Sequence, residues 1–167
     1  MGSKLAVALL AVSATVPWCP SPLGAQARTR PVPPLLALAL NELDFGMVFP
    51  GIPSSVPVHD PRNAGLFQVQ GPPGASVRVE FLLPGALAAS GGGLLPVLFG
   101  PSDGFSDFSR GRPPRGLNFD PHAPVIGTLG PNGSLYLRLG GTVLPARTQP
   151  GGEYRATIFM TVYDLGM

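Results

Sequence analysis

Residues Glu153–Leu165 read EYRATIFMTVYDL and carry the strongest structural signal in the chain. Apolar side chains occupy every second position along this stretch, which is typical of a β-strand with one buried face. An amphipathic helix would instead repeat its apolar residues every three or four positions. One face of the predicted strand carries Tyr154, Ala156, Ile158, Met160 and Val162, and the other carries Arg155, Thr157, Phe159, Thr161 and Tyr163.

Two segments nearer the middle of the chain show the same alternation. Ser76–Leu83 (SVRVEFLL) places Val77 and Val79 on one face, and Leu66–Gln70 (LFQVQ) alternates apolar with polar residues. The intervening Gly71-Pro72-Pro73-Gly74 has the composition of a turn. We therefore predict that the two segments form a β-hairpin.

Shorter strand signals fill most of the remaining chain. The dipeptide Asn132-Gly133 adds a strong hairpin signal, and Pro57 restricts its segment to the edge of a sheet. The helix-like composition of Gly85–Ser90 is too short to form a helix alone. The other predicted strands are Leu36–Leu40, Ser55–His59, Leu94–Phe99, Val125–Leu129, Leu135–Leu139 and Gly141–Leu144.

These segments predict an all-β fold, an antiparallel β-sandwich of about seven to nine strands. A parallel sheet would need crossover helices, for which the sequence has no signal. With 23 glycines and 22 prolines, the chain is rich in turn residues, but 44% hydrophobic content argues against disorder. We expect Gly100–His122 to be a long exposed loop.

The N-terminal region has the pattern of a secretory signal peptide. Lys4 precedes the uncharged apolar stretch Leu5–Trp18, which is shorter than the roughly 20 residues of a membrane span. Ala25 and Ala27 supply the small residues that a signal peptidase reads, so we predict cleavage after Ala27. The predicted organisation is a signal peptide over 1–27, a proline-rich lead-in over 28–34 and a sandwich domain over 35–167.

This pattern predicts export to the periplasm, the outer surface or the medium. Cleavage would also remove Cys19, the one cysteine, so the processed domain would depend on its core rather than on a disulfide. No transmembrane span is expected after processing. With 11 Lys and Arg against 9 Asp and Glu, the chain lacks the basic excess of a nucleic-acid-binding protein.

Candidate catalytic and metal-binding residues have simpler explanations as turn residues. Ser102 lies in a G-x-S-x-G sequence, but a hydrolase elbow needs a strand before it and a helix after it. His59-Asp60 and Asp120-Pro121-His122 could bind a metal only if the fold brought them together, and both are good turn formers. We therefore expect a non-enzyme, with no catalytic, metal-binding or cofactor-binding residues.

Three aromatic residues in the predicted loop are the candidate contact site for a ligand or partner. Phe105, Phe108 and Phe119 interrupt an otherwise polar segment, and loops carry binding function more often than cores do. The same rings could instead cover the end of the sandwich.

Several short motifs occur in a fixed order along the chain. They are Leu43-Asp44-Phe45-Gly46 with Pro50-Gly51, Ala64–Gly71, Gly140-Gly141-Thr142, and Gln149-Pro150-Gly151 followed by Tyr154 and Thr161-Val162-Tyr163. This ordered set, over about Leu36–Asp164, resembles a bacterial family, the domain-of-unknown-function family forty-four-oh-two of exported, fimbria-like proteins. The resemblance implies an immunoglobulin-like sandwich that is secreted and serves as a pilus or surface subunit without a catalytic site.

Two functional hypotheses remain open at this point. The first is a structural surface subunit that self-associates or joins other fimbria-like subunits. The second is a monomeric binding or adhesion module that uses the loop 100–122. Pro31, Pro33 and Pro34 lack the N–H groups that a donated β-strand needs, which argues against polymerisation through the N-terminal segment.

Overall fold

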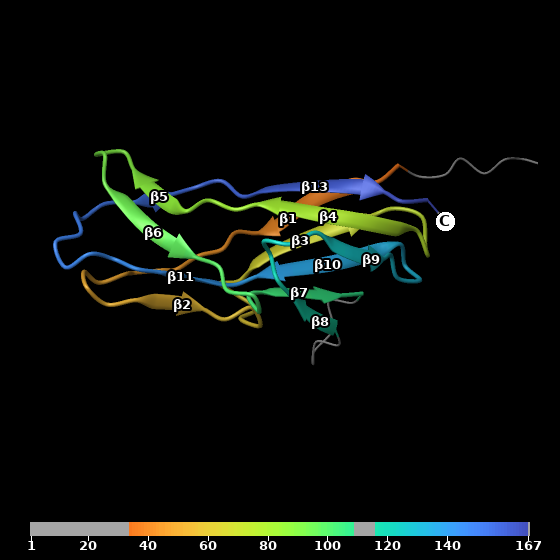
Figure 1. The fold of residues 1–167 in the computed structure, drawn as a ribbon, viewed down its shortest axis with the longest axis horizontal. Helices are drawn as coiled ribbons and strands as arrows, with labels where there is room; N and C mark the ends of the chain where they lie inside the picture. Colours follow the sequence, from red (N-terminus) through yellow and green to blue (C-terminus); the bar gives the residue numbers. More distant parts are fainter. Residues whose placement is uncertain (1–33, 109–115, 167) are drawn as a thin grey trace, which may run out of the picture. The chain divides into compact units, whose positions relative to one another are not determined.

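The fold consists of β-strands throughout residues 34–108 and 116–166, the residues that the structure describes. A computed structural model defines thirteen strands and no helix in these two ranges (Figure 1). The all-β prediction is confirmed, but the expected seven to nine strands are too few. In chain order the strands are β1 (Leu36–Asn41), β2 (Ser54–Val56), β3 (Gly65–Gln70), β4 (Ser76–Leu82), β5 (Ala86–Ala89), β6 (Leu94–Leu98), β7 (Gly104–Asp107), β8 (Gly116–Phe119), β9 (Val125–Thr128), β10 (Ser134–Leu139), β11 (Gly141–Val143), β12 (Tyr154–Arg155) and β13 (Phe159–Asp164).

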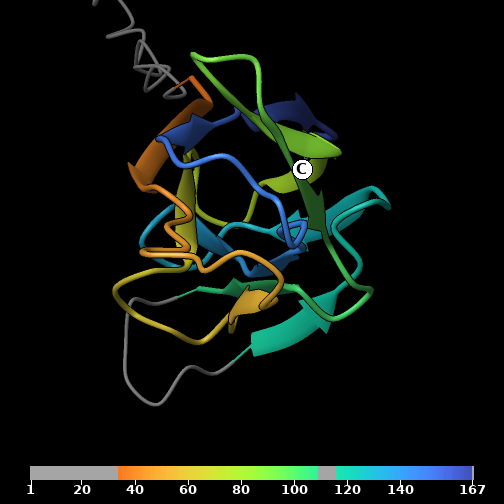
Figure 2. The same cartoon turned by 90° about the vertical axis from the view of Figure 1, so that its left-hand side faces the viewer.

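The strands pair in three antiparallel sheets. One five-stranded sheet has the order β1-β3-β10-β7-β8, and the three-stranded sheet has the order β13-β4-β9. These two sheets are the layers of a sandwich, because their inner side chains form a single buried cluster. A second five-stranded sheet, β12-β5-β6-β11-β2, continues from both layers at the end of the domain that faces the viewer in Figure 2.

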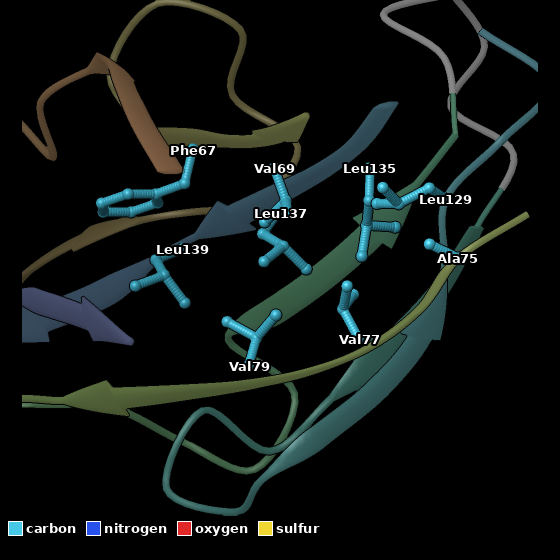
Figure 3. Packing of buried hydrophobic residues seen from close by; sticks show 9 residues of the cluster. All are labelled: Phe67, Val69, Ala75, Val77, Val79, Leu129, Leu135, Leu137 and Leu139. Atoms are coloured by element: carbon cyan, nitrogen blue, oxygen red, sulfur yellow. The ribbon is translucent and has the colours of Figure 1, made fainter. Parts of the chain in front are cut away.

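The main core lies between β4 and the strand pair β3 and β10. Figure 3 shows Val77 and Val79 pointing from one layer toward Val69 and Leu137 of the other. All four side chains have no exposed surface. Fully burying a side chain of this size contributes about 1.5–3 kcal/mol, so this cluster supplies a large share of the stability.

Gly140 is the junction at which one sheet becomes the next. β10 ends at Leu139 and β11 begins at Gly141, so a single extended segment contributes to both five-stranded sheets. A Cβ at position 140 would lie 2.5 Å from the Val56 carbonyl oxygen and 2.8 Å from the Val58 nitrogen. Only glycine allows the backbone to pass this close to a neighbouring strand.

The predicted hairpin between residues 66–70 and 76–83 is wrong. β3 pairs with β1 and β10, whereas β4 pairs with β13 and β9, so the two strands face each other across the core. The loop between β3 and β4 is hydrogen-bonded instead to the loop between β9 and β10. The Gly71 N–H donates to the Gly133 oxygen, and the Gly74 N–H donates to the Leu129 oxygen. Both strands have an apolar face, and these faces are buried best when they pack together.

Asn132-Gly133 forms the expected turn, but the strands beside it are not a hairpin. Gly133 has a φ of 70° and its N–H donates to the Gly130 oxygen. β9 nevertheless belongs to the three-stranded sheet and β10 to the five-stranded one. The turn therefore carries the chain from one layer to the other.

The expected long loop over Gly100–His122 contains two strands. β7 pairs with the edge of β10, and β8 pairs with β7. Backbone pairing forms these strands despite their polar composition, and Gly104 leaves room for the ring of Phe119, with which a Cβ at this position would collide.

The long C-terminal strand is split, although its two faces are as predicted. β12 pairs with β5 and β13 pairs with β4, with residues 156–158 between them. Ile158, Met160 and Val162 pack against the main core, while Phe159 and Tyr163 are exposed. The alternation thus grouped these side chains into the correct two faces but did not show the change of sheet.

Replacing Leu137 by alanine should lower the free energy of unfolding by about 2–5 kcal/mol, because it leaves a cavity between the layers. Chemical denaturation of the purified protein measures this change. Leu117, which is 77% exposed, is the control, and Leu117→Ala should change the stability by no more than about 0.5 kcal/mol. Similar losses for the two variants would contradict the assignment of the core.

The Gly140→Ala variant should lose about 1–3 kcal/mol of stability, because its methyl group would collide with the backbone at Val56 and Val58. Gly85→Ala is the matched control, since a Cβ at position 85 meets nothing within 4 Å. Urea unfolding curves of both variants test the difference. Equal midpoints would show that β10 and β11 are not locked together at this position.

Candidate binding groove

A groove of about 1130 Å³ lies between two free sheet edges. One wall is formed by β1 and the segment 41–50 that follows it, and the other by residues 149–158, which include β12. Phe67, Leu87 and Leu95 contribute to its apolar lining. Among the described strands, β1 pairs with β3 alone and β12 with β5 alone, so each wall presents an unpaired edge.

The groove opens beside β1 because that strand brings only methyl groups to the core side. Ala37 is in register with Val69 and Ala39 with Phe67, so both alanines point to the same side as the core residues. Both are nevertheless exposed, whereas Val69 has no exposed surface. The sandwich is therefore not closed at this edge.

The β1 edge carries little of the usual protection against strand pairing. Natural edge strands are commonly blunted by charged residues, proline or a very short length. The sequence of β1, LALALN, has six residues without a charge or a proline. A β-bulge or similar irregularity can also protect an edge, and β1 has one shift of register in its pairing with β3, between Ala39 and Asn41.

Asn41 and Asp44 fix the wall that follows β1. The Asn41 Nδ2 group donates to the Arg62 oxygen at 2.8 Å and to the Ala64 oxygen at 2.9 Å. The Asp44 N–H donates to the Asn63 oxygen at 2.9 Å. These bonds tie the first wall to the segment that leads into β3.

Tyr154 and Gln149 fix the opposite wall. The Tyr154 hydroxyl donates to the Pro150 oxygen and accepts from Gln149 Nε2, both at 2.7 Å. Gln149 Nε2 also donates to the Leu94 oxygen of β6 at 3.0 Å. Both walls are thus held by side-chain hydrogen bonds, so the groove is a preformed feature of the fold.

Charged groups line both walls of the groove. Arg155 Nε donates to Glu153 Oε1 at 3.0 Å, and the pKa of Arg155 is raised, first by this hydrogen bond and the Glu153 charge. The carboxylate of Glu42, on the first wall, raises the same pKa further. The groove therefore presents one cation and several anions along an otherwise partly apolar channel.

This arrangement suits an extended peptide better than a small substrate. Unpaired backbone edges can add a strand by hydrogen bonding, and the apolar lining can accept alternate side chains. The described residues include no group of three or more His, Cys, Asp or Glu side chains that could hold a metal ion.

The three candidate aromatic residues lie in different environments. Phe105, on β7, is 4% exposed and makes an edge-to-face contact with His59 at 4.7 Å between ring centroids. Phe119, at the end of β8, packs against the main core on the opposite face of the sheet and stacks on Phe81. Phe108 is the exposed member of the three, at 50%. Ala25 and Ala27, the predicted cleavage residues, lie outside the described residues.

Ser102 and the candidate metal ligands occupy turns. Ser102 lies in a turn closed by the Asp103 N–H donating to the Gly100 oxygen, and strand β7, not a helix, follows it. Asp120 accepts a hydrogen bond from the His122 N–H, and the His122 ring bonds to the Phe99 oxygen. His59 packs on Phe105, so the two histidines have separate structural partners.

Sequence reasoning did not identify the groove. The available signal was the alternation of leucine with alanine in Leu36–Leu40, which puts the smallest apolar side chains on one face. That signal becomes informative only when β1 is known to be an edge strand and its alanines are known to point inward.

Comparison with known proteins adds no relative. No family model matches the chain, and neither the curated proteins nor the solved structures gave a match. The described residues contain no helix that is both long enough and apolar enough to cross a membrane.

Asp60, one of the candidate metal ligands, accepts hydrogen bonds within the turn before β3. Hydrogen bonds from the Arg62 N–H, the Asn63 side chain and the Asn63 N–H lower the pKa of Asp60 below its ordinary value of 3.8. A carboxylate with a lowered pKa stabilises the fold above the unfolded-state pKa, and this contribution disappears as the pH falls through the folded-state pKa.

Asp60→Ala should therefore lower the melting temperature at neutral pH, and its difference from wild type should shrink as the pH falls below about 3.8. Thermal unfolding followed by circular dichroism across this pH range tests the expectation. Asp60→Asn, which keeps an acceptor oxygen, is the control and should lose less stability. A difference between Asp60→Ala and wild type that is constant with pH would refute the role of the carboxylate.

Proposed function

We propose that this protein is an exported, non-catalytic structural subunit of a bacterial surface assembly, and that its groove accepts an extended segment of a neighbouring subunit. The observation that carries the proposal is the uncharged, proline-free edge of β1 beside an unclosed core. Such an edge is costly to leave exposed because it promotes uncontrolled pairing, so a partner strand is a physical reason for keeping it.

The two sides of the groove support strand addition in complementary ways. The backbone of β1 can pair with an incoming strand, and Ala39 leaves space for a larger side chain of that strand. Ile158 lines the groove and lies partly buried against the core, so an inserted side chain would complete its packing.

The partner that fits best is a different subunit. Pro31, Pro33 and Pro34 of this chain lack N–H groups and would interrupt the hydrogen bonding of a donated strand. The groove instead calls for a segment with alternating side chains, an intact series of N–H groups and a charge pattern suited to Glu42 and Arg155.

Export is supported by the N-terminal sequence pattern. Lys4, the apolar stretch that follows and the pair Ala25 and Ala27 form the expected signal peptide. The motif resemblance to exported fimbria-like proteins points the same way.

The alternative proposal is a binding or adhesion module that uses residues 100–122. Phe108, at 50%, and Leu117, at 77%, are exposed in or beside β7 and β8 at the edge of the first five-stranded sheet. Phe105 and Phe119 are buried or partly buried, so the surface available to a ligand is smaller than the sequence suggested. The groove supports the structural proposal more directly.

A photo-crosslinking amino acid at position 39 should capture an extended segment of another exported subunit in the producing bacterium. Position 88 is the matched control, because Ala88 is an exposed alanine on β5 that does not line the groove. Mass spectrometry identifies the captured peptide, and cell fractionation locates the adduct. Ala39→Trp should abolish incorporation into surface assemblies, whereas Ala88→Trp should leave it unchanged.

Two results would contradict the proposal. Retention of the chain in the cytoplasm would exclude a surface subunit. Equal crosslinking at positions 39 and 88, or normal surface assembly of Ala39→Trp, would exclude the groove as the contact.

A further inference from the structure

The outer face of the three-stranded sheet is unusually apolar for a surface exposed to water. A two-layer antiparallel sandwich normally alternates apolar side chains toward the core with polar side chains outward. In β4, β9 and β13 the inner side chains are buried as expected, but large apolar side chains also point outward. These are Leu82 (68% exposed), Ile126 (73%), Phe159 (59%) and Tyr163 (47%).

The strand register places these side chains in two groups on one face of the sheet, which we call the outer face. Phe159 lies opposite Leu82 in the first group, and Tyr163 and Ile126 flank Arg78 in the second. Exposed apolar side chains gathered on one face mark an interaction surface more often than scattered ones do.

One cation and one anion occupy the middle of the outer face. Arg78 and Glu80 are two residues apart on the same face of β4 and form an ion pair. The Arg78 guanidinium also lies over the Tyr163 ring, 5.9 Å from its centroid. The charged groups of β4 on this face therefore cancel, so neither an anionic membrane nor nucleic acid would be attracted to it.

We propose that the outer face binds a second copy of this chain across a two-fold axis. When two such faces stack with their β4 strands antiparallel, Arg78 of each copy lies over Glu80 of the other. With the β4 strands parallel, like charges would meet. The single pair of opposite charges is thus self-complementary in one arrangement, as an isologous interface requires.

This contact is independent of the groove. The outer face belongs to β4, β9 and β13, and none of its apolar residues named above lines the groove. A symmetric contact closes after two copies, whereas strand addition joins different subunits. The protein would therefore pair with itself through one surface and bind its neighbour through another.

Charge reversal on the full-length purified protein tests the proposal by sedimentation equilibrium. Arg78→Glu and Glu80→Arg should each weaken self-association by about tenfold or more, because each places two like-charge pairs in the interface. An equimolar mixture of the two variants should form heterodimers with about wild-type affinity. The double variant Arg78→Glu with Glu80→Arg should also recover dimerisation, since every cross-interface pair is again opposite in charge.

Leu82→Ser should weaken the dimer, whereas Leu94→Ser should leave it unchanged, because Leu94 is equally exposed (66%) but lies on β6. Circular dichroism and melting temperatures establish that the variants are folded. A monomeric wild type at about 1 mM, single reversals that dimerise normally, or a mixture that does not recover would each overturn the proposal.

The variants also separate this proposal from the groove. Ala39→Trp should keep the dimer, and the charge-reversal variants should keep the crosslink at position 39. If the wild type forms the crosslink but not the dimer, the outer-face contact is contradicted. If it forms the dimer but not the crosslink, the groove contact is contradicted.

Discussion

The packing of Val77 and Val79 against Val69 and Leu137 holds the two layers of the sandwich together. These side chains come from different sheets and have no exposed surface (Figure 3). Their burial holds β4 in one layer and β3 and β10 in the other, and this separation determines where every later strand can pair. The close passage of the backbone at Gly140 then extends the same strands into the second five-stranded sheet.

The same constraint leaves one edge of the sandwich open. β3 takes β1 on its outer side, and the chain that precedes β13 pairs with β5 as β12, so β1 and β12 face each other across the groove without pairing. The methyl group of Ala39 does not fill the space between them. The groove is therefore a consequence of how the layers are assembled, and its walls are then fixed by hydrogen bonds from Asn41 and Tyr154.

Both proposed contacts arise from parts of β-strands that the described fold leaves uncovered. On β1 this part is a backbone edge without charges, and on β4 and β13 it is an outer face that carries Leu82 and Phe159. Exposed edges and exposed apolar faces both favour association, but they select different partners. An edge pairs with an extended segment, whereas a face with one pair of opposite charges fits a copy of itself.

The all-β class, most strand positions and the shared face of Ile158, Met160 and Val162 could be predicted from the sequence, because alternation is a local property of the chain. The turn at Asn132-Gly133 could be predicted too. The pairing of the strands, the strands within Gly100–His122 and the groove could not. These features emerge only when the chain is folded, because strand partners are chosen by which apolar faces meet across the core, and that choice depends on residues far apart in the chain.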